Sequence, residues 1–334
     1  MTSSRPPWEH AAGSPAAAGP VRIDAVVARR WTAAEDIVGL ELHAVDGSSL
    51  SGYEPGAHIP VEVAPGVIRH YSLCDGSGGA LRIAVLLDPN SRGGSAAVHR
   101  SLWPGTVVRI GQPRNDFPLV ADVEHTILVA GGIGITPLIA MARALHEQQA
   151  SFELHYCVRT LSRAAFLTEL RTESYRESVY VHLDDGPPNQ RFDPPRVLAR
   201  PRPGVQLYFC GPTGLLDALC ATAADLGWPK GQISLERFRG APPVSGHEFS
   251  VQAQLSGQTV SVTENQTIVA ALARAGIDVP VSCEEGVCGT CLLKVIDGIP
   301  DHRDCFQSDE EHRQNRWITP CCSRSKSPRL VLEV

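Results

Sequence analysis

The chain has 334 residues, too many for one compact core, so about two or three domains are expected. Its composition, 43% hydrophobic and 20% charged, is that of a globular protein, and the net charge of −6 argues against nucleic acid or an anionic membrane as a partner. No apolar run approaches the roughly 20 residues of a transmembrane helix, and residues 1–20 lack the apolar stretch of a signal peptide, so we expect a disordered leader on a cytoplasmic protein with reduced thiols.

Residues 21–118 are predicted to form an antiparallel β-barrel. Short apolar segments are separated by Gly, Pro, Asp and Ser at the intervals that barrels show. The predicted strands are 21–30, 36–45, 58–63, 69–74, 81–87 and 106–110.

Residues 119–240 change pattern, because buried strands now alternate with helices. A strand near residue 125 leads into a glycine-rich turn and a helix with Leu138, Met141, Ala142 and Leu145 on one face. This alternation predicts an α/β domain with a parallel sheet and helices on its faces.

Residues 241–334 are predicted to form a separate α+β domain after a linker at 239–246. The expected elements are two strands at 247–255 and 258–263, a helix at 267–275 and a closing strand at 329–334. A cysteine-rich loop lies between the helix and the last strand.

Four cysteines in this last domain have the spacing C-x4-C-x2-C followed by a fourth thiol after a gap of 29 residues: Cys283, Cys288, Cys291 and Cys321. This is the plant-type [2Fe–2S] spacing. Zinc usually takes two C-x2-C pairs, of which only one is present, and disulfides are disfavoured in a reducing compartment.

The segment resembles the plant-type ferredoxins in its cysteine spacing and in the β-grasp order of its elements. The resemblance implies that Cys321, and not its neighbour Cys322, is the fourth ligand. Cys305 has no place in the pattern and is interpreted as an ordinary thiol.

Two motifs in the barrel suit a flavin. In R-H-Y-S-L, residues 69–73, Arg69 could bind phosphate, Tyr71 could lie on a flat ring and Ser72 could reach a ring nitrogen. In the second motif Gly93 and Gly94 precede a helix with Ser95 as the predicted N-cap, a combination that favours anions. Each motif alone is equally compatible with an exposed arginine or a plain capped helix.

A glycine loop in the α/β domain suggests a dinucleotide, but it departs from the Rossmann fingerprint. In G-G-I-G-I-T-P, Pro137 stands where the last glycine of G-x-G-x-x-G belongs. A second motif, F-C-G-P at residues 209–212, follows about 80 residues later and is predicted to form another turn at the end of a strand.

Together these motifs resemble the ferredoxin-NADP reductase superfamily, and most closely the phthalate dioxygenase reductase and vanillate demethylase reductase branch, over residues 20–334. The resemblance implies an FMN site at Arg69, His70, Tyr71, Ser72, Leu73, Gly93, Gly94 and Ser95. It implies a nucleotide site at Gly131, Gly132, Gly134, Thr136, Pro137, Cys210, Gly211 and Pro212. It also implies that Phe238 covers the flavin ring; Glu236 lies on the same strand face, and Ser72, Cys210, Phe238 and Glu236 would be nearest to the chemistry.

By this resemblance the chain is expected to be a monomeric reductase that passes electrons from NADH through FMN and [2Fe–2S] to a Rieske-type oxygenase component. NADH is preferred over NADPH by resemblance, although Arg159 could pair with a 2′-phosphate. Three alternatives stay open: a P450 or di-iron oxygenase as acceptor, a redox sensor without steady turnover, and a zinc-binding interaction module on a flavoprotein. The acidic residues 308–312 are interpreted as a solvated loop.

Overall fold

The computed structural model describes residues 22–334 except 66, 76, 90–92, 239–244, 282–285, 287–288, 305–306 and 308. The chain divides into two compact units. The first unit consists of the segment that ends at Tyr53 together with His58–Arg114. The second unit consists of Glu54–Ala57 and Asn115–Val334.

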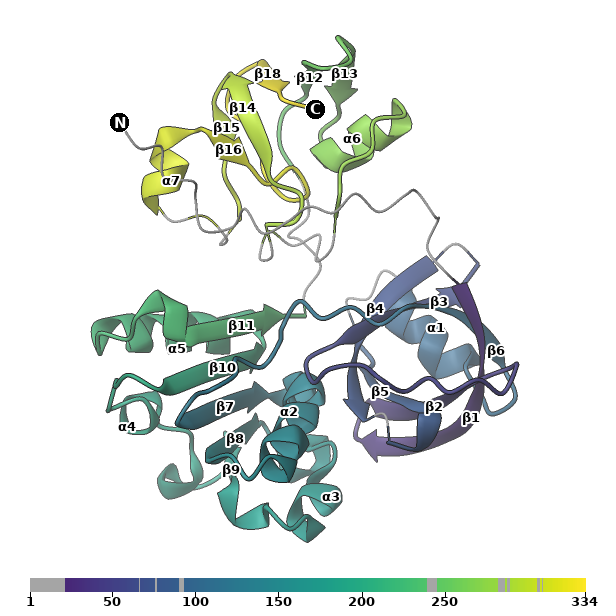
Figure 1. The fold of residues 1–334 in the computed structure, drawn as a ribbon, viewed down its shortest axis with the longest axis vertical. Helices are drawn as coiled ribbons and strands as arrows, with labels where there is room; N and C mark the ends of the chain where they lie inside the picture. The colour runs from purple at the N-terminus through teal and green to yellow at the C-terminus, as the bar shows by residue number, and fades with distance from the viewer. Residues whose placement is uncertain are drawn as a thin grey trace. The chain divides into compact units, whose positions relative to one another are not determined.

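The first unit is a closed barrel in the strand order β1-β2-β5-β4-β3-β6 (Figure 1), which confirms the predicted antiparallel barrel. Its elements are β1 (Arg22–Ala34), β2 (Ile37–Ala44), β3 (His58–Ala64), β4 (Val67–Asp75), the 3-10 turn η1 (Ser77–Gly79), β5 (Leu81–Leu86), α1 (Gly94–Ser101) and β6 (Val107–Gly111). Alternate residues of β3, among them Ile59 and Val61, are fully buried inside the barrel, as the period of two along a strand requires.

The second unit begins with a parallel sheet in the order β11-β10-β7-β8-β9, again as predicted. Its strands are β7 (His125–Gly131), β8 (Phe152–Val158), β9 (Val179–Leu183), β10 (Val205–Gly211) and β11 (Ile233–Arg237). Its helices are α2 (Ile135–Glu147), α3 (Leu167–Thr172), α4 (Pro194–Val197) and α5 (Thr213–Asp225), with 3-10 turns η2 (Gly132–Gly134), η3 (Leu161–Arg163), η4 (Arg176–Ser178), η5 (Pro188–Gln190) and η6 (Lys230–Gln232).

Helices lie on both faces of this sheet (Figure 1). Val129 and Phe209 pack with Leu216 and Leu219 of α5 in one buried cluster. The predicted apolar face of α2 is buried throughout. The strand order reverses between β7 and β10, and at such a switch point open α/β sheets bind their ligands beyond the carboxyl ends of the strands.

The rest of the second unit contains a mixed sheet in the order β13-β12-β18-β14-β16. The strands β15 and β17 form a separate two-stranded sheet. The elements of this part are β12 (Phe249–Ala253), β13 (Thr259–Val262), α6 (Ile268–Arg274), β14 (Leu293–Asp297), β15 (Pro300–Asp301), α7 (Asp309–Gln314), β16 (Trp317–Ile318), β17 (Arg324–Ser325) and β18 (Arg329–Leu332). The helix α6 begins where predicted, because the Thr267 side chain caps it by accepting from the N–H of Ala270 at 3.0 Å.

One prediction in this region was wrong. Residues 309–314 form the helix α7 and not a solvated loop. No helix among the described residues is both long enough and apolar enough to cross a membrane.

Candidate functional site

The predicted phosphate site brings together two segments of the barrel unit. Gly94, the first residue of α1, lies directly against the side chain of Arg69 from β4: a Cβ built on Gly94 would be 2.5 Å from Arg69 Nε and 2.8 Å from its Cγ. Gly93, just before the helix, has a left-handed backbone with φ 89°. A guanidinium beside the first turn of a helix is a chemical environment that suits a phosphate group.

The N-cap prediction for Ser95 was wrong. The helix α1 begins at Gly94 with Gly93 as its N-cap residue, and no side chain of the described residues caps it. The Ser95 hydroxyl instead accepts a hydrogen bond from the backbone N–H of Asp88 at 3.1 Å, so it links the segment after β5 to the helix. The N–H groups of the first turn of a helix have no partner within the helix and can bind a ligand.

The other residues of the R-H-Y-S-L motif follow β4 into the barrel. Tyr71 is half-buried, and burial raises its pKa to about 12, so its phenol stays protonated. Ser72 is buried and Leu73 is fully buried in the barrel core. His70 is exposed and lies with its Nδ1 at 3.2 Å from Nδ1 of His58 on β3.

In the second unit the glycine loop and the F-C-G-P turn meet at the switch point between β7 and β10. A Cβ on Gly131 would be 2.7 Å from Pro212 Cδ, and a Cβ on Gly211 would be 2.9 Å from Gly131 Cα. A Cβ on Gly134 would collide with the backbone carbonyl of Cys210. The two strand ends can approach each other closely only because these three positions are glycine. The absence of side chains there leaves space for a dinucleotide at the switch point.

The remaining loop residues start α2. Gly132 has φ 54° and stands in η2, and the Thr136 hydroxyl donates to the carbonyl of Ile133 at 3.0 Å. Pro137 lies in the first turn of α2. There its missing N–H costs no helical hydrogen bond, which explains why this loop tolerates proline where the Rossmann fingerprint has glycine.

Cys210 and Glu236 lie opposite each other on β10 and β11. The thiol of Cys210 is fully buried and donates to Glu236 Oε2 at 3.8 Å. Burial, followed by the negative charge of Asp116, raises the pKa of Glu236 to about 8. Near neutral pH this carboxyl therefore carries a proton in an apolar setting. The influence of Asp116 was not foreseen, because it comes from the segment between the barrel and the sheet.

Phe238 directly follows β11, and 37% of its side chain is exposed. An exposed phenylalanine at a strand end is available to cover a ligand ring. Its predicted role over the flavin stays a prediction.

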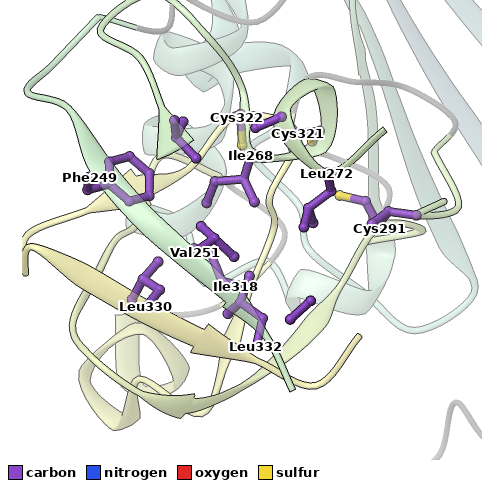
Figure 2. Close-up of a cluster of buried hydrophobic side chains, with 14 residues drawn as sticks. Phe249, Val251, Ile268, Leu272, Cys291, Ile318, Cys321, Cys322, Leu330 and Leu332 are labelled. Carbon is purple, nitrogen blue, oxygen red and sulfur yellow. The ribbon is translucent and has the colours of Figure 1, made fainter. Parts of the chain in front are cut away.

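In the ferredoxin-like part the structure describes two of the four predicted ligands, since Cys283 and Cys288 lie outside the described residues. Cys291 and Cys321 are buried, and a hydrogen bond between their thiols raises the pKa of Cys321. These two cysteines are 30 residues apart in sequence, yet their thiols are in contact. Such an arrangement is expected of two ligands of one cluster. Figure 2 shows the three labelled cysteines of this part, Cys291, Cys321 and Cys322, at one end of the core, near Ile268 and Leu272.

Cys322 is also buried, as expected, but its sulfur has different neighbours. It lies 3.5 Å from the Thr319 hydroxyl and 3.8 Å from the Ser323 hydroxyl. These hydrogen bonds, after a larger one with Cys321, lower the pKa of Cys322 to about 7. A Cβ on Gly286, whose φ is 78°, would collide with this sulfur. Gly286 therefore packs directly on Cys322, and glycine is required there.

Comparison with known proteins agrees with these features. Residues 251–326 match the family model of the 2Fe-2S iron-sulfur cluster binding domain, so this part binds a [2Fe–2S] cluster. The chain is 44% identical over 316 residues to the vanillate O-demethylase oxidoreductase of Pseudomonas sp. (strain HR199 / DSM 7063), covering 93% of this chain and 100% of that protein. It is 39% identical to the phthalate dioxygenase reductase of Burkholderia cepacia, covering 92% and 96%.

Solved structures give the same fold. A phthalate dioxygenase reductase, described as a modular structure for electron transfer from pyridine nucleotides to [2Fe–2S], superposes with a TM-score of 0.73 at 37% identity, covering 94% of this chain and 98% of that one. An intact type IV self-sufficient cytochrome P450 monooxygenase gives 0.76 at 37% identity, but the match covers 96% of this chain and only 43% of that one.

The barrel, the parallel sheet and the [2Fe–2S] domain thus lie in one chain that matches the vanillate and phthalate reductases over nearly their whole length. The chain belongs to the family of oxygenase reductases that includes vanillate O-demethylase oxidoreductase and phthalate dioxygenase reductase, which are flavin- and iron–sulfur-dependent electron-transfer oxidoreductases.

Proposed function

We propose that this chain is the NADH-dependent reductase component of a two-component Rieske-type non-haem iron oxygenase, with FMN and the [2Fe–2S] cluster as its electron carriers. The proposal rests on the share of a relative's length that this chain matches. The chain is 44% identical to a vanillate O-demethylase oxidoreductase over the whole length of that protein, which supports the same role as a reductase for an oxygenase component.

A cytochrome P450 is the second candidate acceptor. It is favoured by the self-sufficient P450, of which a portion matches this chain at 37% identity. That protein is more than twice as long as the matched portion, whereas the vanillate and phthalate reductases match end to end. The end-to-end match to these two reductases therefore supports the Rieske partner that the resemblance implies.

The residues fit the groups that the proposal requires. The Arg69 guanidinium beside the uncapped first turn of α1 would hold the FMN phosphate. The close glycines at residues 131, 134 and 211 leave room for the nucleotide backbone at the switch point. Cys291 and Cys321 would hold the cluster together with Cys283 and Cys288.

When bound, the flavin supplies the conversion from a two-electron hydride donor to single electrons for the cluster. The chain's own residues bind and orient the carriers and exclude water. At the end of the sheet the buried thiol of Cys210 donates to the half-buried Glu236, whose carboxyl is protonated near neutral pH. Neutral groups there avoid repelling an electron-rich nicotinamide, and no general base is needed for hydride transfer.

NADH is proposed over NADPH. Arg159, which follows β8 and could pair with a 2′-phosphate, is exposed, so the preference for NADH rests on the resemblance to NADH-using relatives.

The test is an electron-transfer assay with the purified holoprotein. We expect NADH to reduce cytochrome c through the cluster faster than NADPH does, which a redox sensor without turnover would not show. Two separate oxygenases are then offered as acceptors, one Rieske-type vanillate demethylase and one P450. Product formation with the P450 alone would overturn the Rieske assignment, and lack of any steady NADH oxidation would overturn the reductase assignment.

A further inference from the structure

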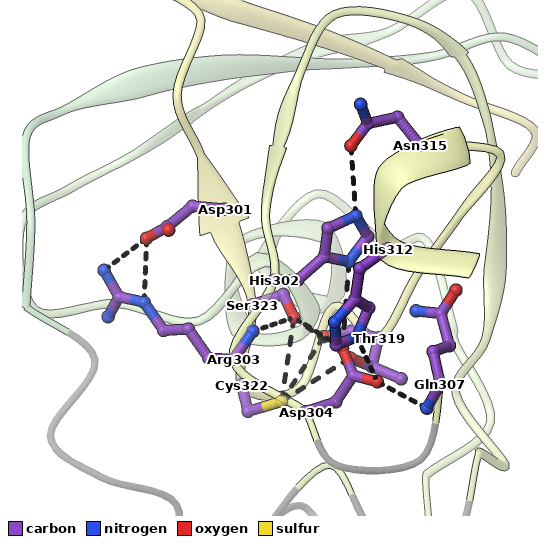
Figure 3. A network of polar contacts seen from close by, with 10 residues as sticks. All are labelled: Asp301, His302, Arg303, Asp304, Gln307, His312, Asn315, Thr319, Cys322 and Ser323. Carbon is purple, nitrogen blue, oxygen red and sulfur yellow. Dashed lines mark hydrogen bonds and ion pairs between the residues drawn. The ribbon is translucent and has the colours of Figure 1, made fainter. Parts of the chain in front are cut away.

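Three polar side chains converge in the ferredoxin-like part, outside the cysteine motif. His302 and Asp304 follow β15, and His312 stands on α7. His312 Nε2 lies 3.2 Å from Asp304 Oδ2, and His302 Nδ1 lies 3.8 Å from Asp304 Oδ1. The two imidazole rings are stacked with centroids 4.4 Å apart (Figure 3).

The group is built into the protein interior. The Asp304 carboxylate is fully buried, only 7% of the His302 side chain is exposed and 22% of the His312 side chain is exposed. The carboxylate accepts hydrogen bonds from the Gln307 backbone N–H at 2.9 Å and the Ser323 hydroxyl at 3.4 Å. Asp304 is therefore held in one orientation.

Asn315 determines the tautomer of His302. The Asn315 Nδ2 group donates to the carbonyl of Arg313 at 3.5 Å, so its Oδ1 faces His302 Nε2 at 3.1 Å and accepts the proton of that nitrogen. His302 Nδ1 then presents a lone pair toward the carboxylate. Among the described residues it has no hydrogen-bond partner.

A buried lone pair that faces a buried carboxylate is unfavourable unless a positive charge lies between them. No neighbouring guanidinium supplies that charge within the described part of the chain. Arg303 donates twice to Asp301, at 2.9 Å and 2.7 Å, and Arg313 donates to Glu310. The charge must come from a proton or from a bound cation.

We propose that His302, Asp304 and His312 form a binding site for a divalent transition-metal ion of the zinc class. Two imidazole nitrogens and one carboxylate oxygen are a set that zinc takes, with a fourth position left for water. The candidate ligand atoms all lie within 4.8 Å of one another, whereas ligands about 2.0–2.2 Å from a zinc ion are up to roughly 4 Å apart. Closing that difference requires His312 to move inward and one ring to turn, because a ligating nitrogen points its lone pair in the plane of its ring and the two stacked planes differ by only 19°.

The surroundings also match those of a metal site. A metal-bound histidine commonly donates its other N–H to a carbonyl oxygen, which fixes the ring, and Asn315 Oδ1 accepts such a bond here. The bound ion would tie α7 to the segment after β15. Asp304 in turn lies against Gly286, because a Cβ on Gly286 would be 2.9 Å from Asp304 Cβ.

The experiment is equilibrium dialysis of the full-length holoprotein against Zn²⁺ buffered by a competing chelator, with zinc and iron measured by mass spectrometry. We expect about one equivalent of zinc to bind, with iron content and cluster absorbance unchanged. If the protein kept its [2Fe–2S] cluster but did not bind zinc tightly, the proposal would be overturned. A proton would then occupy the position between His302 and Asp304.

Substitutions separate the proposed site from other histidines. His312→Ala, at a partly exposed position, should weaken zinc binding by more than the roughly 10–100-fold that loss of an outer partner costs. His43→Ala is the matched control, since His43 Nε2 is paired with a carboxylate at 3.0 Å but belongs to no such group. Equal zinc binding by the His312→Ala and His43→Ala proteins would overturn the assignment.

A third variant tests the outer partner. Asn315 has a left-handed backbone with φ 50°, so Asn315→Gly keeps the helix end while it removes the side-chain amide and with it the oxygen that faces His302. We expect zinc affinity to fall by about 10–100-fold. Unchanged zinc affinity in this variant would contradict the role of Asn315 Oδ1 in orienting His302.

Discussion

Arg69 of β4 and Gly94 of α1 lie in direct contact, although 24 residues separate them in sequence. The space for the arginine stem exists only because Gly94 has no Cβ. The neighbouring Gly93 is needed for a different reason, namely its φ of 89°. The two adjacent glycines therefore serve two separate requirements of one predicted anion site.

Gly94→Ala should release FMN. The added methyl group would displace the Arg69 side chain from the first turn of α1, and we expect flavin affinity to fall at least about tenfold, or roughly 1.4 kcal/mol. Flavin retained on gel filtration measures this. Gly231→Ala is the control, because a Cβ there meets nothing within 4 Å.

Arg69→Ala should cause a similar loss by removing the guanidinium itself. If both the Arg69→Ala and the Gly94→Ala proteins retained flavin as the Gly231→Ala protein does, Arg69 would not belong to the site.

Cluster ligation should separate Cys321 from Cys322. The Cys321 thiol contacts the thiols of Cys291 and Cys322, and the Cys322 sulfur in addition faces the hydroxyls of Thr319 and Ser323. Cys321→Ser should abolish the cluster absorbance, as should Cys288→Ser, while NADH still reduces the flavin. Cys322→Ser should keep the absorbance and the electron transfer to cytochrome c.

The opposite result for this adjacent pair, with cluster lost in Cys322→Ser and kept in Cys321→Ser, would exchange their roles. Iron analysis of each variant checks that a change in absorbance reflects cluster content.

The sequence was informative where a local pattern determines structure. Short apolar segments between turn residues predicted the strands of the barrel, and the apolar segment at 267–275 predicted α6, whose cap at Thr267 is a local property. The three-part fold followed from these patterns together with the cysteine spacing.

Contacts between distant segments could not be predicted in this way. Ser95 has the right residue type for an N-cap, but its hydroxyl is bound to Asp88 instead. His302 and His312 come together because α7 folds back over the segment after β15, and the acidic sequence 308–312 gave no sign of a buried partner. The effect of Asp116 on Glu236 likewise depends on tertiary structure.

Glu236 should give the unfolding free energy a pH dependence. Its folded-state pKa, about 8, lies above the ordinary value of 4.5, so between these pH values the folded chain keeps a proton that the unfolded chain has lost. The stability contributed by this group therefore falls as pH rises through that window and levels off above pH 8.

Glu236→Gln removes this titration. Relative to wild type the variant should gain stability between about pH 5 and 8, by roughly 1–3 kcal/mol because the side chain is partly exposed. Urea unfolding at several pH values measures the difference. Asp116→Asn should move the window to lower pH, and identical pH profiles for wild type and Glu236→Gln would contradict the raised pKa.

Arg324 is a buried cation that joins three segments of the ferredoxin-like part. Only 1% of the residue is exposed, and it donates to the carbonyls of Gln266, His247 and Thr263 at 2.7, 2.9 and 3.0 Å. Its guanidinium also lies over the Phe249 ring, 5.0 Å from the centroid. A hydrogen bond from a charged donor contributes more than a neutral one, and a buried carbonyl left without its donor is costly.

Arg324→Met should therefore lower the unfolding free energy of this part by roughly 3 kcal/mol or more, so that cluster absorbance is lost at a lower urea concentration. Arg324→Lys should be intermediate, because an ammonium keeps the charge but cannot match the planar fork that reaches all three carbonyls. The control is Arg313→Met on α7, where an exposed ion pair with Glu310 is removed and stability should hardly change. A midpoint for Arg324→Met equal to that of Arg313→Met would show that the three carbonyls find other donors.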